Sequence, residues 1–481
     1  MLEANSSDGK NDLPLCVDLD GTLLKTDTLF ESVACALRDW QTMIRLPFWL
    51  LGGKSRFKAK LSEHIQPNPA LLPYNEVVLK HLHAEKKKGR HLILATAANQ
   101  RIASAINAHI GLFDEIIASS ATRNLRGKEK ADVLAERFGL RQFDYIGNDS
   151  TDLHVFRVAR KGLLVNPSKH IEKRARTIDS TECLLAKRPS DYKSIIKTIR
   201  PYQWVKNLLI FVPIITSISF GDLAAWRNAI VMFLAFCATS SGIYVINDIF
   251  DLEADRLHPD KRQRPFAGGS LPLVYGFVLF PILMATGIAL AFATSQPFFV
   301  PGYAVISIAY SAKLKQVPLV DLFVLASLYT IRLFAGGEVT GYKVSLWLLA
   351  YSGFLFFSLA IIKRVAELKM ILKASKKHSL RRGYEIQDID LLQQMGISSS
   401  FVSSLVLALY TQSEMAQNTY RHPEVLWCTI PLLLFWQCRL WMSTSRNYMH
   451  SDPIVYAAKD WVSRLVGLFL IVILLMANAN F

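Results

Sequence analysis

The sequence predicts a chain of two parts: an N-terminal α/β, Rossmann-like domain built on a parallel sheet, followed by an all-α membrane domain. Three observations lead to this prediction. The 481 residues exceed the usual size of a single domain. Apolar residues make up 51% of the chain and crowd into its C-terminal three-fifths. Before about residue 186, short apolar runs alternate with helix-length segments, a rhythm typical of a parallel sheet covered by helices.

Five short apolar runs are the expected strands of the first domain. They read PLCVDLD, HLILATAA, FDEIIAS, FDYIGND and GLLVN, and polar residues bound each of them. Residues 28–90 contain no such run, so we expect an inserted helical cap there. We place the domain at residues 12–186 and a linker at 187–199, because the polar segment TECLLAKRPSDYKS contains Pro189.

Nine apolar stretches predict nine transmembrane helices within residues 200–481. They lie at 207–220, 228–249, 271–294, 298–312, 319–336, 345–362, 398–413, 425–441 and 463–480. Alternate connections are basic: 187–206, 254–270, 311–318, 363–397 and 439–464 hold 6, 4, 2, 8 and 4 Lys and Arg residues. The other connections contain only Arg227, Lys343 and Arg421. Because cytoplasmic loops are enriched in Lys and Arg, we expect a cytoplasmic N-terminal domain and an outside C-terminus.

Charge and cysteine usage narrow the possible functions. The formal net charge of +16 is accounted for by the basic loops, so nucleic-acid binding is not expected. The six cysteines show no CxxC spacing, which argues against a disulfide framework and a zinc site. The first residues, MLEANSSDGKNDLP, lack the apolar core of a secretory signal.

The first predicted strand ends in VDLDGTLLKTD, which brings Asp18 and Asp20 to the carboxyl edge of the sheet, where Gly21 lets the chain turn. Two carboxylates there can converge on one cation and one phosphoryl group. The motif resembles the first motif of the haloacid dehalogenase-like phosphatases. That resemblance covers residues 12–185 and implies that Asp18 is the nucleophile and Asp20 the general acid/base.

The later motifs of that family match in order. Thr96, which ends HLILAT, matches the hydroxyl that binds phosphate, and Lys130 in RGKEKADVL matches the lysine that neutralises the phosphoenzyme, with Lys128 as the alternative. YIGNDSTD matches the acidic metal-binding motif. The implied Mg²⁺ ligands are Asp18, Asp20, Asn148, Asp149 and Asp152.

One departure concerns the metal. If Asp152 takes the last acidic position, Asn148 stands where the family has an aspartate, and Asp149 is its neighbour. An amide oxygen binds Mg²⁺ without contributing charge, so we expect weaker metal affinity unless Asp149 substitutes. The alternative is a retained fold without turnover.

A cluster of acids follows the second predicted span in GIYVINDIFDLEADRLHPDKRQRPFAGG. Asp248, Asp251 and Asp255 stand at i, i+3 and i+7, so a helix places them on one face with Asn247 one turn before Asp251. These carboxylates repel one another, and Mg²⁺ relieves that cost by binding carboxylates together with phosphate oxygens. Three basic residues follow and either bind further anionic oxygens or belong to an ordinary cytosolic loop: Lys261, Arg262 and Arg264.

NDxxDxxxD at this place resembles the UbiA-type intramembrane polyprenyl transferases, in which the motif holds a diphosphate through Mg²⁺. The best-known members alkylate aromatic rings and carry a second DxxxD motif after the sixth span. Here that loop reads IIKRVAELK, with Lys363 and Arg364 in place of acids and Glu367 as the nearby carboxylate. Two cations suit an anionic lipid phosphate better than a neutral phenol.

Several phrases resemble one branch of that superfamily, the polyprenyl-phosphate (decaprenyl-phosphate) phosphoribosyltransferases. They are IRPYQWVKN, DLEADRLHPDKRQRP, YSAKLKQVPLVD, IRLFAGG and KRVAEL, and the resemblance covers residues 195–481. It implies that Asn247 and the three aspartates bind Mg²⁺ and the diphosphate of phosphoribosyl pyrophosphate. The implied phosphate ligands are Arg200, Gln203, Lys206, Lys261, Arg264, Lys315, Lys363 and Arg364. Tyr310 and Asp321 would position ribose hydroxyls.

Three further charged residues lie in the membrane domain. Arg332 lies inside an apolar segment, where a guanidinium is costly unless it faces an anion or an acid, so a functional or paired role is expected. Asp452 and Asp460 lie in the last basic loop and either close the site or, as is more usual for loop acids, are solvated.

Together, the resemblances imply a bifunctional, Mg²⁺-dependent, multi-pass enzyme of a bacterial inner membrane. Its membrane domain would transfer 5-phosphoribose from phosphoribosyl pyrophosphate to a polyprenyl phosphate, and its N-terminal domain would remove the 5-phosphate, for synthesis of an arabinofuranosyl or ribosyl lipid donor. The alternatives are an aromatic polyprenyl transferase that uses a polyprenyl diphosphate, a transferase with a silent phosphatase-like scaffold, and, less favoured, a transporter. A homo-oligomer is left open.

Overall fold

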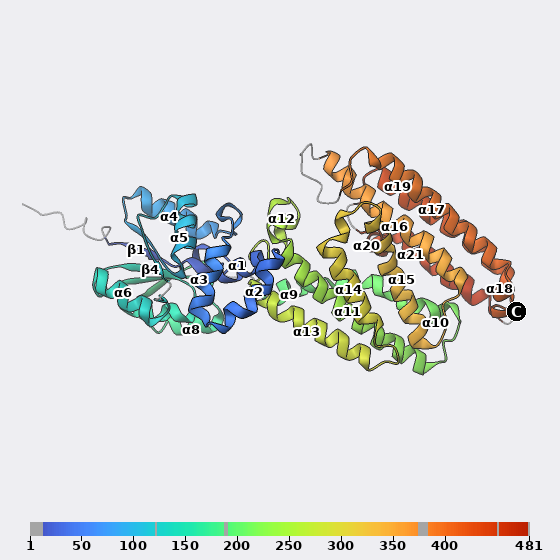
Figure 1. The fold of residues 1–481 in the computed structure, drawn as a ribbon, viewed down its shortest axis with the longest axis horizontal. Helices are drawn as coiled ribbons and strands as arrows, with labels where there is room; N and C mark the ends of the chain where they lie inside the picture. The colour runs from blue at the N-terminus through green and yellow to red at the C-terminus, as the bar shows by residue number, and fades with distance from the viewer. Residues whose placement is uncertain (1–12, 121–122, 187–190, 374–382, 450–451, 480–481) are drawn as a thin grey trace, which may run out of the picture. The chain divides into compact units, whose positions relative to one another are not determined.

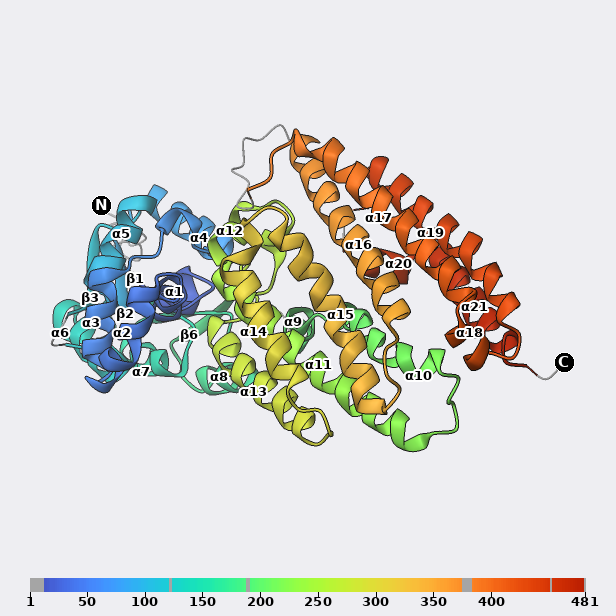
Figure 2. The same ribbon diagram turned by 45° about the vertical axis from the view of Figure 1, so that its right-hand side comes forward.

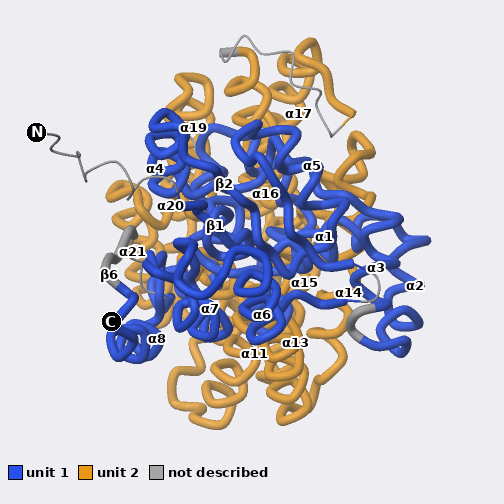
Figure 3. The backbone as a smooth tube through the Cα atoms, turned by 90° about the vertical axis from the view of Figure 1, so that its left-hand side faces the viewer, with its two compact units in different colours: residues 1–199, 245–279 blue, residues 200–244, 280–481 orange. Residues whose placement is uncertain are grey.

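The structure is a computed structural model that describes residues 13–120, 123–186, 191–373, 383–449 and 452–479. The chain forms two compact units (Figure 3). Unit 1 contains residues 1–199 and 245–279, and unit 2 contains residues 200–244 and 280–481. The segment 245–279 therefore packs with the N-terminal part of the chain, although it follows the second predicted span.

A parallel sheet of six strands is the centre of unit 1 (Figure 1). Its order is β3-β2-β1-β4-β5-β6, and every neighbouring pair is parallel. The strands are β1 (Leu15–Val17), β2 (Leu92–Asn99), β3 (Glu115–Ser119), β4 (Asp144–Gly147), β5 (Lys161–Val165) and β6 (Thr181–Ala186). The prediction of a parallel sheet is confirmed, and β6 is a strand that the sequence reasoning missed.

Helices cover both faces of this sheet, which explains why its strands are apolar without alternation. Leu15 and Val17 of β1 belong to one hydrophobic cluster together with residues of α5, whereas Cys16 belongs to the opposite cluster together with residues of α6 and α7. These helices and their neighbour are α5 (Gln100–Ile110), α6 (Lys128–Phe138), α7 (Leu153–Val158) and α8 (Lys169–Ala175).

Helices fill the stretch between β1 and β2, as the expected cap requires. After a tight turn, η1 (Leu19–Leu23), they are α1 (Thr28–Ala36), α2 (Trp40–Leu51), α3 (Lys54–His64), η2 (Pro69–Leu71) and α4 (Glu76–Lys87). Several begin at a side chain that caps the helix: Asp27 accepts from the backbone N of Leu29, and Asp39 accepts from the backbone N of Thr42. Unit 1 also contains η3 (Ser150–Asp152), α9 (Asp191–Ile199), α12 (Leu252–Leu257) and η5 (Lys261–Gln263).

Long helices dominate the rest of the chain, and Figure 2 shows α16 alongside α17. The long helices are α11 (Leu223–Phe250), α13 (Leu273–Phe292), α15 (Val320–Thr340), α16 (Leu346–Lys373), α17 (Asp388–Thr411) and α19 (Thr429–Ser445). The shorter elements are η4 (Pro201–Phe211), α10 (Val212–Thr216), α14 (Phe299–Ala312), η6 (Leu314–Gln316), α18 (Glu414–Thr419), η7 (Pro423–Cys428), α20 (Pro453–Lys459) and α21 (Trp461–Met476).

Six helical segments in the described residues are long and apolar enough to cross a membrane, so the chain is a multi-pass membrane protein. Five are α11, α13, α15, α16 and α17, and the sixth joins η7 to α19 as Pro423–Ser445. The predicted spans at 298–312 and 463–480 correspond to the shorter α14 and α21. The stretch 207–220 is broken into η4 and α10, with Pro213 near the start of α10. The prediction of nine spans therefore stays a prediction.

Candidate functional site

The carboxyl end of β1 carries Asp18, which is held against a buried lysine. Lys130 Nζ lies 2.7 Å from Asp18 Oδ1 and 2.9 Å from the hydroxyl of Tyr145. Lys130 is buried in α6, whereas the alternative, Lys128, is exposed. The geometry thus selects Lys130 as the cation beside Asp18. Sequence reasoning missed Tyr145, which is the residue before Ile146 in β4.

Asp20 lies on the turn after Asp18 and faces the first turn of α1. Its carboxylate accepts from the backbone N of Thr28 at 2.7 Å and from the Thr28 hydroxyl at 3.3 Å. Burial, followed by the charges of Asp27 and Asp18, raises the pKa of Asp20 to about 8. Burial likewise raises the pKa of Asp18, while Lys130 acts in the opposite direction. Asp20 can therefore hold a proton at neutral pH, as a general acid must.

The Asn148 side chain packs against Gly21, which lies on the same turn. Gly21 has φ +76°, and a Cβ there would stand 2.2 Å from Asn148 Nδ2, so only glycine fits. The Thr22 hydroxyl donates to Asn148 Oδ1 at 3.2 Å. The predicted departure therefore places an amide, without charge, next to the two aspartates.

Asp152 organises the loop that carries Asn148. Its carboxylate accepts from the backbone N of Asn148 at 2.9 Å, from the backbone N of Asp149 at 3.0 Å and from the Tyr145 hydroxyl at 2.7 Å. Asp149 caps the following turn by accepting from Ser150 N. These contacts give Asp152 a positioning role in this structure, because its two oxygens are already occupied by donors.

Thr96 lies within β2, where the pairing with β3 becomes irregular between Thr96 and Asn99, and it is fully buried. Its hydroxyl accepts from the backbone N of Ala98 at 3.0 Å. The neighbouring residue Ala97 lines the cavity together with Asp18. The irregular segment after Thr96 therefore faces the cavity, and the Thr96 hydroxyl would have to exchange its present partner to bind phosphate.

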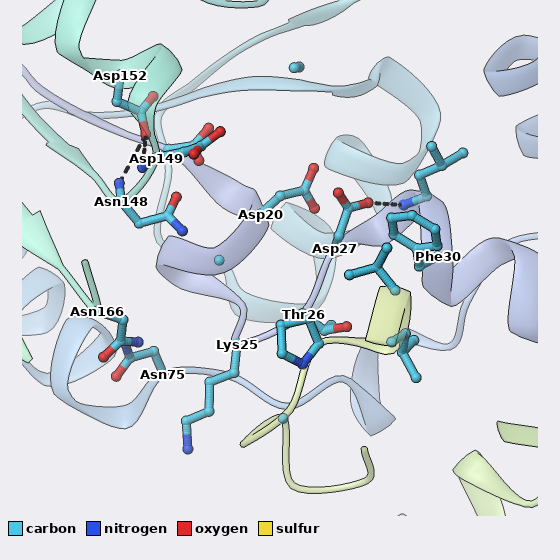
Figure 4. A pocket seen from close by; sticks show the side chains of 18 of the residues that line it. Asp20, Lys25, Thr26, Asp27, Phe30, Asn75, Asn148, Asp149, Asp152 and Asn166 are labelled. Atoms are coloured by element: carbon cyan, nitrogen blue, oxygen red, sulfur yellow. Dashed lines mark hydrogen bonds between the residues drawn. The ribbon is translucent and has the colours of Figure 1, made fainter. Parts of the chain in front are cut away.

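A cavity of about 800 Å³ opens over these residues (Figure 4). Asp18, Asp20, Lys130 and Asn148 line it, and the cap contributes Phe30, among other residues. The donor set fits Mg²⁺, because burial and the charges of Asp27 and Asp18 raise the pKa of Asp20, a cation would relieve this cost, and an amide oxygen stands beside the carboxylates. In the described residues, however, no group of three or more His, Cys, Asp or Glu side chains is already arranged around a metal position.

The aspartate cluster is the second candidate site of unit 1. The helical path continues from α11 into α12, because Asp251 N donates to the Asn247 carbonyl at 2.9 Å and Asp255 N donates to the Asp251 carbonyl at 2.8 Å. Arg264 Nη1 lies 3.1 Å from Asp248 Oδ1 and 2.6 Å from Asp255 Oδ2. Asp248 and Asp255 therefore share one guanidinium, as acids on one helical face would.

Burial of this cluster favours a cation. Asp248 and Asp255 are each 3% exposed. Burial raises the pKa of Asp255, Arg264 lowers it, and Asp248 raises it again. Lys261 and Arg262 are exposed in the following turn. The acids therefore fit Mg²⁺, with Arg264 and the exposed basic residues available for anionic oxygens.

Unit 2 contains one buried carboxylate, Asp452, with two lysines beside it. Asp452 Oδ2 lies 2.6 Å from Lys206 Nζ and 3.5 Å from Lys363 Nζ. Burial alone would raise the pKa of Asp452, but the two lysines lower it to about 2. The expectation that Asp452 is a solvated loop acid is not met, because it is 9% exposed. Two cations on one carboxylate leave a net positive charge, which is suited to an anion.

Arg364 has a different environment from its neighbour Lys363. It is 1% exposed, and its Nη2 lies 2.5 Å from Asp321 Oδ2, while Glu367 pairs with its other terminal nitrogen. The Tyr384 hydroxyl lies 2.5 Å from Asp321 Oδ1. Asp321 and Glu367 thus compensate the charge of Arg364. These contacts fit a structural ion pair better than a side chain that is free to bind phosphate.

Arg332 is buried among neutral groups. Its Nε donates to Asn207 Oδ1 at 2.7 Å, and its Nη2 donates to the Tyr303 hydroxyl at 2.9 Å. It also lies over the Tyr303 ring at 4.6 Å. The expected acid or anion is not among these contacts, and a functional role for Arg332 stays a prediction.

The remaining predicted ligands occupy partly exposed positions. Arg200 lies over the Tyr244 ring at 5.2 Å, and Tyr310 accepts from Arg364 at 3.4 Å. Gln203 and Lys315 are half-buried. Asp460, the other loop acid, caps α21 and pairs with Arg439 at 2.8 Å.

The fold and these sites define a membrane protein with a phosphatase-like domain attached to a helical transferase domain. Comparison with known families agrees: residues 208–446 match the UbiA prenyltransferase family, and residues 15–157 match the haloacid dehalogenase-like hydrolases. The chain belongs to the UbiA prenyltransferase family and carries a haloacid dehalogenase-like domain at its N-terminal end, so both predicted resemblances are confirmed.

The chain is similar to three proteins over different shares of its length. Uncharacterized protein y4nM of Sinorhizobium fredii is 34% identical over 95% of this chain and 89% of that protein. Nodulation protein NoeC of Azorhizobium caulinodans is 32% identical over 59% of this chain and 94% of that protein. The decaprenyl-phosphate phosphoribosyltransferase of Mycolicibacterium smegmatis is 29% identical over 50% of this chain and 78% of that protein.

Proposed function

We propose that this chain is a bifunctional enzyme of a bacterial inner membrane, with nine spans and a cytoplasmic N-terminal domain. Its membrane domain transfers 5-phosphoribose from phosphoribosyl pyrophosphate to a polyprenyl phosphate. Its N-terminal domain then removes the 5-phosphate from the lipid product. The single observation that carries the proposal is the buried acid cluster bridged by Arg264, in a chain similar to decaprenyl-phosphate phosphoribosyltransferases.

In the transfer step, the bond between C1 of ribose and the diphosphate oxygen breaks, and a lipid phosphate oxygen forms the new bond to C1. The electron pair of the broken bond leaves with the diphosphate. Mg²⁺, when bound, neutralises that leaving group. Asp248, Asp251 and Asp255 would hold the metal, and Arg264 would bind a diphosphate oxygen. Lys206 and Lys363 supply the net positive charge that an acceptor phosphate requires.

In the phosphatase step, Asp18 attacks the 5-phosphate and the ester bond between phosphorus and the sugar oxygen breaks. Asp20 gives its proton to the departing 5-hydroxyl, which its raised pKa permits. Lys130 stabilises the negative charge of the phosphoenzyme. Water then attacks that phosphorus while Asp20 accepts a proton, the bond between phosphorus and the Asp18 oxygen breaks, and inorganic phosphate is released. Asp18, Asp20 and Asn148 would hold Mg²⁺, which would supply positive charge to the phosphate oxygens.

The test uses purified full-length protein in lipid nanodiscs with phosphoribosyl pyrophosphate, a polyprenyl phosphate and Mg²⁺. Diphosphate release and mass spectrometry of the lipid report the two steps separately, because the product mass gives both the pentose and the number of phosphates. Folded protein that releases no diphosphate would overturn the transferase proposal. Prenylation of a phenol from a polyprenyl diphosphate would instead support the aromatic transferase. A lipid product that keeps its 5-phosphate would leave the N-terminal domain as a silent scaffold.

A further inference from the structure

The cavity over Asp18 has a wall that belongs neither to the sheet nor to the cap. Gly268, Gly269, Ser270, Pro272, Leu273 and Val274 form this wall, which we call the 268–274 wall. It leads directly into α13, a candidate membrane span. Only 17% of the most apolar stretch of this helix is buried within the protein. The first turn of a membrane helix thus lines a cavity that also contains a phosphatase-like set of residues.

Specific contacts within unit 1 hold this wall in place. Arg256 Nη2 lies 2.6 Å from Glu31 Oε1, and Arg256 Nε donates to the carbonyl of Ala267, the residue before the wall, at 3.2 Å. The Arg256 and Glu31 side chains are 7% and 1% exposed. A Cβ on Gly269 would stand 2.6 Å from the Cβ of Lys25, so the wall packs closely against the start of the cap. The wall is therefore a fixed part of the cavity.

The cavity lining combines charged or polar side chains with apolar ones. Asp18, Asp20, Lys130 and Asn148 are among the charged and polar residues. The apolar residues come from the cap and from the 268–274 wall: Leu29, Phe30, Val77, Pro272, Leu273 and Val274. A lining with both kinds of side chain can accommodate an amphiphilic ligand.

The apolar surface continues beyond the cavity along α13. Val274 is 37% exposed and Val278 is 51% exposed. These residues stand at i and i+4 of one helix, so they share a face. Because α13 is a candidate span, hydrocarbon and not water is expected to cover this face.

We propose that the 268–274 wall makes the N-terminal domain selective for phosphomonoesters carried on a membrane lipid. The phosphate lies against Asp18, and the prenyl chain leaves the cavity over Val274 along the exposed face of α13. Lys25, an exposed cation that lines the cavity, can meet the phosphodiester between sugar and lipid. A soluble sugar phosphate leaves the apolar residues of the lining uncovered. This inference rests on the proposed phosphatase function and names the substrate class of that site.

The test compares two phosphomonoesters with the full-length protein in nanodiscs of phosphatidylethanolamine and phosphatidylglycerol. One is farnesyl-phosphoryl 5-phosphoribose and the other is ribose 5-phosphate, and the readout is phosphate release. We expect wild-type kcat/KM to be at least tenfold higher for the lipid substrate. Val274→Asp, which adds a charge to the apolar exit, should lower the ratio of the two kcat/KM values about tenfold.

The matched control is Leu51→Asp, on an exposed position of α2 outside the cavity lining, and it should leave the ratio unchanged. Diphosphate release in the transfer assay checks that Val274→Asp is folded, and Val274→Ser serves as a milder second variant. An unchanged ratio in both Val274 variants, or a wild type that prefers ribose 5-phosphate, overturns the inference while the phosphatase function stands. Wild-type protein that hydrolyses neither substrate overturns the phosphatase function itself, and the inference with it.

Discussion

Arg256 and Glu31 form a buried, two-point ion pair although 225 residues separate them. Arg256 Nη1 lies 3.0 Å from Glu31 Oε2, and Nη2 lies 2.6 Å from Oε1. The residue before Arg256, Asp255, belongs to the acid cluster through Arg264. Glu31 lies one turn into α1, the helix whose Thr28 binds Asp20. Neighbouring residues of α12 therefore contact parts of both candidate sites in unit 1.

Removing one partner of this pair should destabilise unit 1. Glu31→Met leaves the Arg256 charge buried without its carboxylate, so we expect a loss of roughly 3–5 kcal/mol, read as a lower midpoint of chemical unfolding in detergent. The exposed pair Arg123–Glu129 provides the control, because its side chains are 54% and 46% exposed. Glu129→Met should cost less than about 1 kcal/mol. Equal losses in the two variants would contradict the structural role of Arg256.

Loss of a carboxylate from the acid cluster should separate the two activities. Asp251→Asn or Asp255→Asn should lower phosphoribosyl transfer by about a hundredfold or more, because each removes a proposed metal ligand. Phosphate release from farnesyl-phosphoryl 5-phosphoribose should continue, since Asp18 and Lys130 are unchanged. Assaying both products from one preparation makes the comparison internal. Near-normal transfer in both variants would refute the metal assignment.

Substitution of the proposed nucleophile, Asp18, should block the phosphatase step and leave the transfer step intact. Asp18→Asn keeps the shape of the side chain but removes the attacking carboxylate, so transfer should proceed and the 5-phosphorylated lipid should accumulate. Wild-type protein should yield the dephosphorylated lipid. Lipid mass spectrometry distinguishes the two products. Identical phosphorylated products from wild type and variant under saturating Mg²⁺ would favour the silent-scaffold reading.

Charge at position 148 should set the Mg²⁺ requirement of the phosphatase step. Asn148→Asp is close to isosteric, so the fit against Gly21 is preserved while one negative charge is added. We expect the Mg²⁺ concentration for half-maximal phosphate release to fall about tenfold, because affinity follows the charge of the ligands. Ser150→Asp adds the same charge on an exposed neighbour and should change it little. A similar shift in both variants would point to general electrostatics rather than to a ligand.

Local patterns predicted the sheet, but not its last strand. Continuous apolar runs mark β1 to β5 because both faces of those strands are buried. The segment of β6, TECLLA, mixes polar and apolar residues and runs into the polar stretch with Pro189, so its composition does not mark it as a strand. Helical periodicity favours Lys130 over Lys128, because Lys130 lies one turn before the buried Leu134 of α6 and therefore shares its buried face.

Long-range pairing could not be predicted from local patterns. The acid cluster is visible in the sequence because its members share one helical path, whereas Glu31, which pairs with Arg256, and Asp321, which pairs with Arg364, lie on other helices. Asp452 was expected in solvent because loop acids usually are, but its two lysine partners come from η4 and α16. Burial of a charge depends on tertiary contacts that composition does not report.

Lys363 and Arg364 are adjacent in sequence, yet we expect substitution of Lys363 to change substrate affinity and substitution of Arg364 to change folding. The Lys363 side chain is 27% exposed and shares Asp452 with Lys206, so its charge is available to an anion. Lys363→Met should raise the KM for polyprenyl phosphate about tenfold and leave the KM for phosphoribosyl pyrophosphate unchanged.

Arg364→Met instead leaves Asp321 buried without its guanidinium, so the main effect should be loss of folded protein. Size-exclusion chromatography and thermal unfolding in detergent measure folding, and initial rates with each substrate varied in turn measure the two KM values. Lys369→Met, on the same helix, is the control that should change neither. A raised donor KM with an unchanged acceptor KM in Lys363→Met would move that lysine to the donor side of the reaction. A stable, fully folded Arg364→Met with a raised acceptor KM would show that Arg364, rather than Lys363, binds the lipid phosphate.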